Sequence, residues 1–315
     1  MSHASPIDWS TKKVVAISGG VGGARLVHGL ARRLPEGALT VIANTGDDFE
    51  HLGVWVSPDC DTLLYTLAGL APHGQGWGIE GDTFHALSQA LTHGAPDWFQ
   101  LGDRDLGTNL VRTARMRAVE RLTTITEDFC HAHSLPAAIL PMSDTPHPTI
   151  ILDTEGVRYG FQEWLVRHRG RPPVARVELG GDKQPTQEVL AALREADLVI
   201  MPPSNPFLSL DPILALEGVR PLLREKKVIG VSPILRGEAV KGPLAAMIPL
   251  LQNVPARASA VGRYYHDLLD AFVVEDTDVD DALPVMQVSA DTLMSSVEKR
   301  DQLADTVLEI GSRWL

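Results

Sequence analysis

The sequence predicts an α/β fold in which a Rossmann-like parallel sheet is sandwiched by helices and carries a mostly helical insertion. The apolar run from Val14 to Ile17 leads through a glycine-rich turn and a helical pattern into a second apolar run, Leu39 to Ala43. Further apolar runs, Asp197 to Met201 and Lys227 to Val231, each follow a stretch with helical spacing. Short apolar runs that alternate with helices are typical of buried parallel strands.

The 315 residues suffice for one large α/β domain or two ordinary ones. Between residues 61 and 134, runs with helical periodicity are separated by glycine-rich loops, which predicts a helical insertion. Residues 1–60 and 135–315 are then expected to form the core. Strand-like runs return at 137–140, 149–152 and 157–161.

Composition and charge narrow the class of protein. Hydrophobic content of 44% and charged content of 22% are ordinary for a soluble globular chain. The formal charge of −12 argues against nucleic-acid binding, because phosphate backbones are held by basic surfaces. Cys60 and Cys130 form neither a disulfide framework nor a zinc-ligand pattern. The polar N-terminus and the lack of a long apolar segment predict a cytoplasmic protein that binds no membrane.

The turn after the first strand, SGGVGGAR at residues 18–25, is rich in glycine. Such a turn lets backbone N–H groups at a helix N-terminus approach an anion. Its spacing matches neither GxGxxG nor GxxxxGK[ST], so an ordinary dinucleotide site or P-loop is not supported. We predict a nucleotide site at Gly19, Gly20, Gly22 and Gly23, with a turn used only for packing as the simpler alternative.

Two acidic groups follow predicted strands or open helices. Asp47 and Asp48 come directly after the second strand, and Asp59 and Asp61 lie in the segment SPDCDT. Carboxylate oxygens suit Mg²⁺, which usually takes one or two of them together with substrate oxygens and water. Capping of the helix by Asp59 or Asp61 is the alternative. These four aspartates together predict a Mg²⁺ site at this edge of the sheet.

The loop PPSNP, residues 202–206, follows the strand that ends at Met201. Its prolines leave few backbone donors, so Ser204 and Asn205 are the polar groups that remain to contact a ligand. The carboxyl end of a parallel strand is a usual place for base or ribose recognition. We predict nucleotide contacts at Ser204, Asn205 and Pro206, whereas an ordinary turn is the alternative.

Two arginines and one tryptophan complete the candidates. Arg104 and Arg112, in and after LGDRDLGT, could bind a phosphate by a bidentate contact. A solvated helix face is the usual reading of such a run, and we apply it to Arg115 and Arg117. Trp77, in the segment QGWG, lies in a ligand flap or in a surface turn.

Together these segments resemble the 2-phospho-L-lactate transferase (CofD-like) family, which acts in the biosynthesis of the deazaflavin coenzyme F-420. The matching segments run in order from residue 18 to about residue 299, over nearly the whole chain: SGGVGGAR, NTGDD, SPDCDTLLYTLAG, GWGIEGDTF, LGDRDLGTNLVRT, LPMSDTP, PPSNPFLSLDPILALEGVR, VIGVSPILRGEAVKGP, GRYYHDLLDAFVVEDTD and DTLMSSVEK. Each segment alone is weak, but the ordered set is highly specific.

The resemblance implies that the ribityl hydroxyl of the deazaflavin Fo attacks the acyl-bearing phosphate of a guanosine diphospho-acid and releases GMP. Asp61 would hold the ribityl chain and, with Asp47 or Asp48, the Mg²⁺. No obvious general base emerges: either Asp61 or Asp48 acts as the catalytic carboxylate that accepts the proton, or positioning and the charge of the metal suffice. The glycine loop and residues 204–206 would hold the guanylyl half.

The deazaflavin would lie near Trp77 and Gln100. Gln100 stands where the family often has a lysine or arginine, so a neutral hydrogen bond replaces a charge contact there. The resemblance also implies a homodimer.

Two other functions compete with this interpretation. The first is a non-catalytic sugar-nucleotide-binding regulator of the same fold. The loops of such regulators resemble GGGTG and ADDGGS, whereas the corresponding loops of this chain are GGVGG and GDDFEH. An NAD-dependent oxidoreductase would need an acidic ribose partner after the second strand, where Asn44-Thr45-Gly46 stand instead. The sequence does not choose among phospholactate, phosphoenolpyruvate and 3-phosphoglycerate as the acid, because such small differences are worth only about 1–3 kcal/mol in a pocket.

Overall fold

The computed structural model describes residues 7–72, 74–240, 242–280 and 282–315. Within them the main sheet has the strand order β14-β13-β10-β9-β1-β2-β5, and every neighbouring pair is parallel. The predicted parallel α/β fold is therefore confirmed. The strands of this sheet are β1 (Val14–Ser18), β2 (Leu39–Ala43), β5 (Ala138–Pro141), β9 (Leu198–Met201), β10 (Lys227–Val231), β13 (Ala271–Val274) and β14 (Met286–Ser289).

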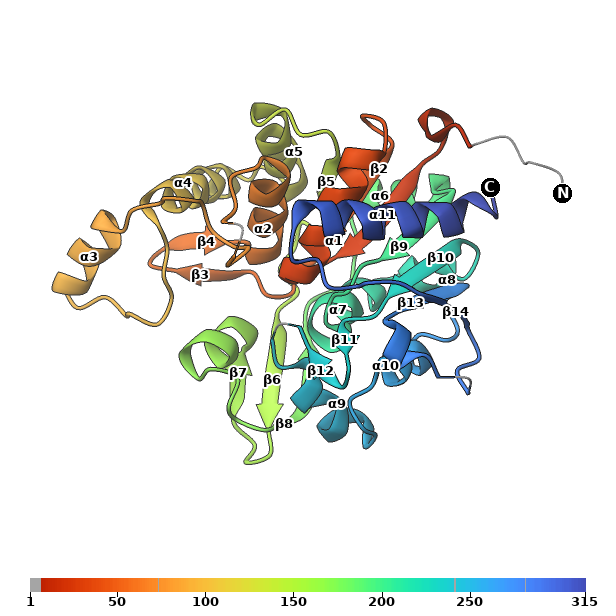
Figure 1. Cartoon of the computed structure of the whole chain (residues 1–315). Coiled ribbons are helices and arrows are strands. Elements are labelled where there is room, and N and C mark those ends of the chain that lie inside the picture. Colours follow the sequence, from red (N-terminus) through yellow and green to blue (C-terminus); the bar gives the residue numbers. More distant parts are fainter. Residues whose placement is uncertain (1–6, 73, 241, 281) are drawn as a thin grey trace, which may run out of the picture.

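Helices cover both faces of the main sheet (Figure 1). In β1, Val14 and Ala16 pack into one apolar cluster while Val15 and Ile17 pack into the other. This double burial explains why the strand is continuously apolar instead of alternating. The first face carries α1 (Gly20–Arg33), α2 (Pro58–Leu67), α5 (Leu122–Ala132) and α11 (Val297–Ser312); the second carries α6 (Gln187–Glu195), α7 (Asp211–Leu214), α8 (Val219–Leu223), α9 (Leu244–Gln252) and α10 (Ala258–Tyr264).

Helix α11 packs closely against α1 at Gly29. Gly29 lies against the backbone carbonyl of Arg300, where a Cβ would collide. The two helices are also joined at the surface, since Arg33 donates to Asp305 and Arg32 pairs with Asp301. The start of α11 is thereby held beside the middle of α1.

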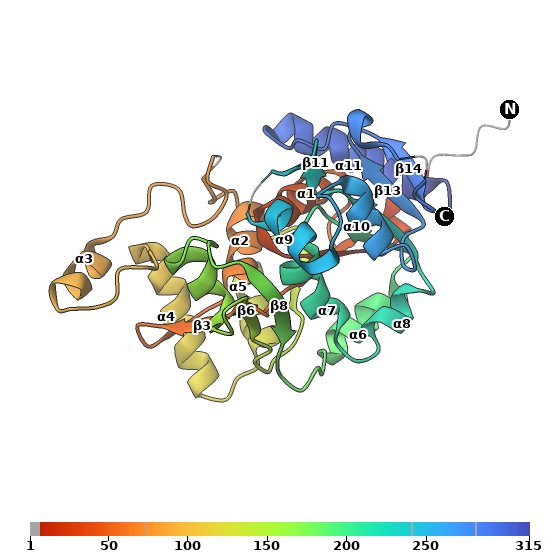
Figure 2. The same cartoon turned by 90° about the horizontal axis from the view of Figure 1, so that it is seen from below.

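The predicted insertion is helical, as Figure 2 shows for its outer part. It contains α3 (His85–Thr92) and α4 (Asp103–Arg117) in addition to α2 and α5. In two details the structure differs from the predicted boundary between core and insertion at residue 61. A hairpin of β3 (Phe49–His51) and β4 (Val54–Val56) already leaves the main sheet and packs on α4, whereas α2 packs on α1 of the core.

A second sheet accounts for two of the later strand-like runs. β6 (Thr149–Asp153), β7 (Arg158–Gly160) and β8 (Val174–Leu179) form an antiparallel sheet apart from the main one (Figure 1). The remaining short elements are η1 (Trp9–Thr11), η2 (Glu163–Arg167), η3 (Pro206–Leu210), η4 (Asp276–Asp278) and the hairpin of β11 (Ile234–Leu235) with β12 (Glu238–Ala239).

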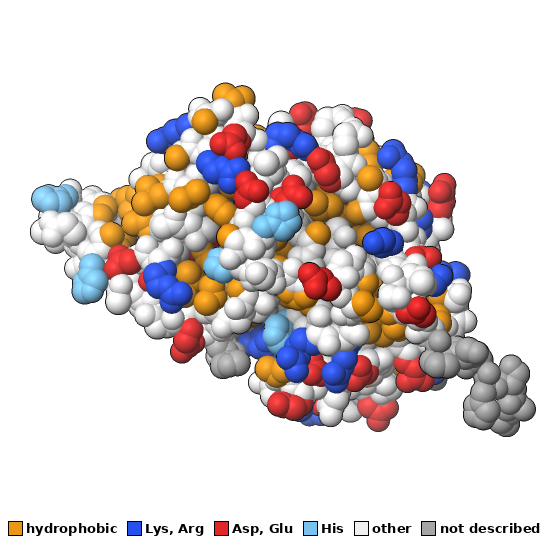
Figure 3. Space-filling view, turned by 90° about the horizontal axis from the view of Figure 1, so that it is seen from above, with side chains coloured by type: hydrophobic (Ala, Val, Ile, Leu, Met, Phe, Trp, Pro, Cys, Tyr) orange, Lys and Arg blue, Asp and Glu red, His pale blue; other side chains and the backbone are white. Residues whose placement is uncertain are grey.

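The surface mixes both signs of charge. On the face shown in Figure 3, Lys and Arg side chains alternate with Asp and Glu side chains. In the part of the chain that the structure describes, no helix has the length and apolar character needed to cross a membrane.

Candidate active site

A cavity of about 660 Å³ opens at the carboxyl ends of β1, β2, β9 and β10. Parallel α/β sheets bind their ligands at this edge, because loops from several strands meet there. Three parts of the chain enclose it. The core supplies the glycine loop and the PPSNP loop, the insertion supplies Trp77 and residues 97–100, and the segment after β7 supplies Phe161, Gln162 and Leu165.

The glycine loop is locked against the PPSNP loop. The Ser204 hydroxyl donates to the carbonyl of Gly19 at 2.8 Å, and the N–H of Gly19 approaches the same hydroxyl at 3.3 Å. A Cβ on Gly22 would lie 2.6 Å from the carbonyl oxygen of Pro203. Gly19, Gly20 and Gly22 line the cavity, while Gly23 instead faces the hydroxyls of Ser18 and Ser204.

The PPSNP loop is itself a helix cap. The Asn205 Oδ1 atom accepts hydrogen bonds from the N–H groups of Phe207 and Leu208 at 3.0 and 3.3 Å. Ser204 and Asn205 line the cavity, whereas Pro206 lies behind them and its carbonyl accepts from the Tyr265 hydroxyl at 3.1 Å. The amide Nδ2 of Asn205 donates to the Met247 sulfur at 3.8 Å, a weak contact that it can exchange for a ligand.

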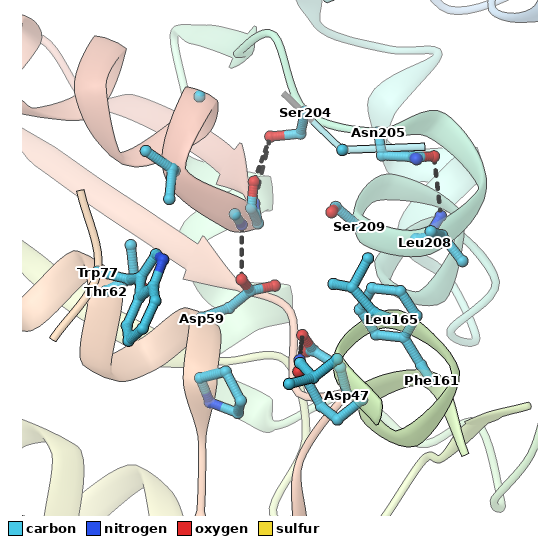
Figure 4. Close-up of a pocket in the computed structure, with 18 of the residues that line it drawn as sticks. Asp47, Asp59, Thr62, Trp77, Phe161, Leu165, Ser204, Asn205, Leu208 and Ser209 are labelled. Atoms are coloured by element: carbon cyan, nitrogen blue, oxygen red, sulfur yellow. Dashed lines mark hydrogen bonds between the residues drawn. The ribbon is translucent and has the colours of Figure 1, made fainter. Parts of the chain in front are cut away.

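Two buried carboxylates form the floor of the cavity (Figure 4). Asp59 accepts from the N–H of Gly20 at 2.6 Å and from Asn44 Nδ2 at 2.9 Å. The same Nδ2 donates to Asp47 at 2.9 Å, and Gln162 Nε2 donates to the other oxygen of Asp47 at 2.9 Å. The structure therefore brings together Asp47 and Asp59, which are 12 residues apart in the chain.

Burial has the largest effect on the pKa of both Asp47 and Asp59. Burial, followed by repulsion from Asp59 and Asp48, raises the pKa of Asp47 well above its usual range. Burial also raises the pKa of Asp59 to about 6, against the hydrogen bonds from Asn44 and Gly20. Burial and the neighbouring carboxylate thus both favour protonation of Asp47.

Asp48 and Asp61 lie differently from this pair. Asp48 accepts from Ser57 Oγ at 2.7 Å and from Trp55 Nε1 at 3.2 Å, outside the cavity lining. Asp61 lines the cavity, but its carboxylate pairs with the buried guanidinium of Arg112. The predicted trio of metal ligands does not converge, and among the described residues no three His, Cys, Asp or Glu side chains are placed to hold a metal ion.

Aromatic side chains make up the opposite wall. Trp77, which is 46% exposed, lines the cavity together with Trp98, Phe99 and Gln100. Trp98 and Phe99 pack edge to face, with ring centroids 5.6 Å apart. In Figure 4, Asp59 and Asp47 lie between Trp77 on one side and Asn205 on the other.

Comparison with known proteins identifies the family. Residues 14–308 match the family model described as 2-phospho-L-lactate transferase CofD. The chain belongs to this family. As a member of the CofD family, the chain is a transferase of coenzyme F-420 biosynthesis.

Relatives of this CofD-family chain carry two different names. A phosphoenolpyruvate transferase of Thermobifida fusca is 38% identical, over 95% of this chain and 98% of the relative. A 2-phospho-L-lactate transferase of Methanosarcina mazei is 36% identical, over 94% of this chain and 99% of the relative. A UPF0052-family protein of Bacillus halodurans has a similar fold, with a TM-score of 0.63, 16% identity and coverage of 95% of this chain and all of the other.

The two arginines predicted to bind phosphate lie outside the cavity of this CofD-family transferase. Arg112 is buried, and its Nη1 donates to Asp61 at 3.1 Å and to Asn109 at 2.6 Å. Arg104 is exposed and donates to the carbonyl of Glu80 at 3.3 Å. Arg112 therefore holds a carboxylate of the protein, because the helix α4 turns it inward and not toward the ligand space.

The prediction of ligand-contacting residues omitted Asp59, Trp98, Phe99 and Arg25, all of which line the cavity. Asp59 stands in the segment SPDCDT, where it has the same motif context as Asp61. Trp98 and Phe99 form an adjacent aromatic pair in a loop, and two neighbouring aromatic residues outside any predicted helix or strand were the available signal. Arg25 ends the segment SGGVGGAR itself.

Proposed function

We propose that the protein transfers a phospho-acid from a guanosine diphospho-acid to the ribityl hydroxyl of Fo, which releases GMP and forms coenzyme F-420 without its glutamate tail. The supporting observation is the cavity, in which one helix N-terminus and two polar loop residues face an aromatic wall across two buried carboxylates. This arrangement suits a nucleotide on one side and a planar tricyclic ring on the other.

The guanylyl half would bind on the core side. Asn205 presents its amide Nδ2 to the base or ribose, since its Oδ1 already caps η3. The N-terminus of α1 begins at Gly20 and offers its backbone donors and positive dipole end to the diphosphate. The N–H of Gly20 now binds Asp59, so it would have to share or exchange that partner when phosphate enters.

The deazaflavin would lie against Trp77 and Trp98, with its ribityl chain directed toward Asp61. Aromatic rings stack well on such side chains, which are rigid and lose little entropy. The terminal ribityl oxygen then forms a bond to the acyl-bearing phosphorus as the bond from that phosphorus to the GMP oxygen breaks. The hydroxyl proton is released to the surrounding carboxylates or water, and GMP leaves with the electron pair.

Asp47 and Asp59 fit a Mg²⁺ ion. They are hard oxygen donors buried side by side, and in the described part of the chain neither forms an ion pair with Lys or Arg. Mg²⁺ usually takes one or two carboxylates and completes its shell with water and phosphate oxygens. Bound there, it would supply charge neutralisation for the diphosphate. Asp61, with Arg112 behind it, orients the ribityl hydroxyl.

The transferred acid is one of phospholactate, phosphoenolpyruvate and 3-phosphoglycerate, and the two names among the relatives leave this choice to experiment. The test is incubation of the purified protein with Fo, Mg²⁺ and each guanosine diphospho-acid in turn. Mass spectrometry should detect GMP and an Fo phosphodiester with at least one donor. Removal of Mg²⁺ with a chelator should abolish the product.

A variant on the outer surface of α1, Arg33→Gln, serves as the matched control and should keep wild-type turnover. Absence of any phosphodiester with all three donors, from protein that is folded and saturated with Mg²⁺, would contradict the proposal.

A further inference from the structure

The charge of the cavity lining is strongly one-sided. Among the described residues that line it, one side chain, that of Arg25, is cationic. The acidic lining residues are Asp47, Asp59, Asp61, Asp97 and Asp105. A guanosine diphospho-acid carries negative charge on its diphosphate and on its carboxylate, and among the described lining residues Arg25 is placed to neutralise one of these groups.

Arg25 lies at the Trp77 end of the cavity. It shares a face of α1 with Val21, four residues earlier, and both line the cavity. Its Nη2 donates to the carbonyl of Gly74 at 3.3 Å, and a Cβ on Gly76 would lie 3.7 Å from the same nitrogen. The guanidinium is therefore held between α1 and the loop that carries Trp77.

A second arginine, Arg300, comes from α11, which packs against α1 so that the carbonyl of Arg300 meets Gly29. Arg300, in the first turns of α11, is only 8% exposed, and its Nε has no hydrogen-bond partner among the described residues. Its neighbour Asp301 pairs with Arg32. Burial and then repulsion from Arg25 lower the pKa of Arg300. The half-buried Arg25 and the buried Arg300 bring two positive charges to this end of the cavity, which favours a bound anion.

The position of Arg25 favours the carboxylate over the diphosphate. The phosphate that receives the attack is expected at the N-terminus of α1, near Gly20 and the carboxylate floor. Arg25 is more than one helical turn farther along, and one turn rises about 5.4 Å. In phospholactate and phosphoenolpyruvate the carboxyl carbon is two bonds beyond the ester oxygen, which suits an offset of this size.

We propose that Arg25, backed by Arg300, binds the carboxylate of the transferred phospho-acid. The inference rests on the proposed function and names the part of the donor that this end of the cavity recognises. Arg25 contacts the substrate, and Arg300 acts through Arg25 as a positioning residue. In 3-phosphoglycerate the carboxylate lies one bond farther from the ester oxygen, so the reach of Arg25 would contribute to the choice of acid.

The test compares two guanosine diphosphate esters that differ in one group. The lactyl ester carries the carboxylate and the ethyl ester lacks it. Titration calorimetry with Arg25→Gln should show about 10- to 100-fold weaker binding of the lactyl ester, the range expected for a lost hydrogen bond to a charged group. Binding of the ethyl ester and of GDP should stay within about threefold of wild type, given that the removed contact is absent from both.

Three further variants sharpen the comparison. Arg25→Lys should bind the lactyl ester with an intermediate affinity, because it keeps the charge and loses the planar fork. Arg300→Gln should weaken the lactyl ester selectively and less than Arg25→Gln does. Arg33→Gln, on the same helix but paired with Asp305 at the surface, should change neither ester.

Thermal melting separates recognition from a structural role. Arg25 is half-buried and its hydrogen bond to the carbonyl of Gly74 is long, so Arg25→Gln should melt close to the wild-type temperature. Equal weakening of both esters and GDP would overturn the inference in favour of a diphosphate contact, and unchanged binding of the lactyl ester would overturn it outright. Wild-type protein that binds neither GDP nor the esters would contradict the proposed function itself, and the inference with it.

Discussion

Asp61 and Arg112 form the most deeply buried ion pair in the described part of the structure, with side chains 7% and 2% exposed. Arg112 also donates to Asn109 and lies over the ring of Phe129, 5.7 Å from its centroid. A change to Asp61 therefore alters stability as well as ligand contact. Removal of one partner from a buried pair typically costs about 3–5 kcal/mol, because the other charge stays buried and unpaired.

We accordingly expect Asp61→Asn to lower the free energy of unfolding by several kcal/mol in addition to lowering turnover. Urea denaturation of the two proteins measures this. Asp48→Asn is the comparison, because burial already raises the pKa of Asp48 and its neutral form fits the site. Equal urea midpoints for wild type and Asp61→Asn would show that the pair contributes no net stability.

Asp59 makes stability depend on pH in a definite direction. Its pKa is raised from 3.8 to about 6, so the folded protein holds the proton more tightly than the unfolded chain does. The stabilising contribution of the protonated form is fully present below pH 3.8 and is lost as the pH rises through about 6. In the presence of a chelator, which removes metal ions, the Asp59→Asn variant should not lose stability over this pH range, because it has no carboxyl group to titrate there.

Melting temperatures of wild type and Asp59→Asn should therefore diverge between about pH 4 and pH 6, with the variant the more stable at neutral pH. Its turnover should fall, as expected for loss of a metal contact, typically by about 10²–10³. A difference in melting temperature that does not change with pH would show that the raised pKa of Asp59 is not its cause.

At the scale of single elements, the PPSNP loop is both a helix cap and a cavity wall. Asn205 Oδ1 caps η3, while its Nδ2 lies 3.8 Å from the Met247 sulfur and remains available to a ligand. The close packing of the two loops gives a second reason for a glycine at position 22, besides the space needed by a phosphate. A side chain there would strike the Pro203 carbonyl before it met any ligand.

The two roles of Asn205 can be separated by two variants. Asn205→Asp keeps the capping oxygen and loses the amide donor, so it should keep wild-type stability and bind GDP about 10-fold more weakly or worse. Asn205→Ala loses both groups and should in addition destabilise the protein by about 1 kcal/mol. Calorimetry with GDP, together with thermal melting, gives both quantities. Unchanged GDP affinity in both variants would place the guanosine elsewhere.

At the scale of the whole molecule, the cavity divides between the core and the insertion. The core contributes the glycine loop and Asn205, whereas the insertion contributes Trp77, Trp98 and Phe99. If the nucleotide and the deazaflavin occupy these separate walls, their affinities should respond to different substitutions. Sites without shared partners usually behave additively.

Trp77→Ala should weaken Fo binding by about 10-fold, as expected for the loss of one aromatic contact of 0.5–1.5 kcal/mol together with its buried area, and should leave GDP binding unchanged. Fluorescence titration with Fo and calorimetry with GDP measure the two affinities. Leu91→Ala, an exposed apolar position on α3 outside the cavity, is the matched control. Parallel loss of GDP affinity in Trp77→Ala would mean that the two ligands share this wall.

The sequence by itself determined the α/β class, the four central strands of the main sheet and the family. Strand and helix periods are local, so Val14 to Ile17 reads as a doubly buried strand without knowledge of its neighbours. The glycine loop and the PPSNP loop were also predictable as cavity residues, because each directly follows a strand whose carboxyl end marks the ligand edge. Both loops line the cavity in the structure.

Only the tertiary structure decided which charges meet. Asp61 and Arg112 are 51 residues apart, and the inward face of α4 could be assigned only once α2 was seen to pack beside it. Asp47 joins Asp59 through Asn44, while Asp48, its direct neighbour in sequence, turns to Trp55 and Ser57. Adjacent aspartates look alike in a sequence, but successive side chains point in different directions, and burial then selects which carboxylate faces the ligand.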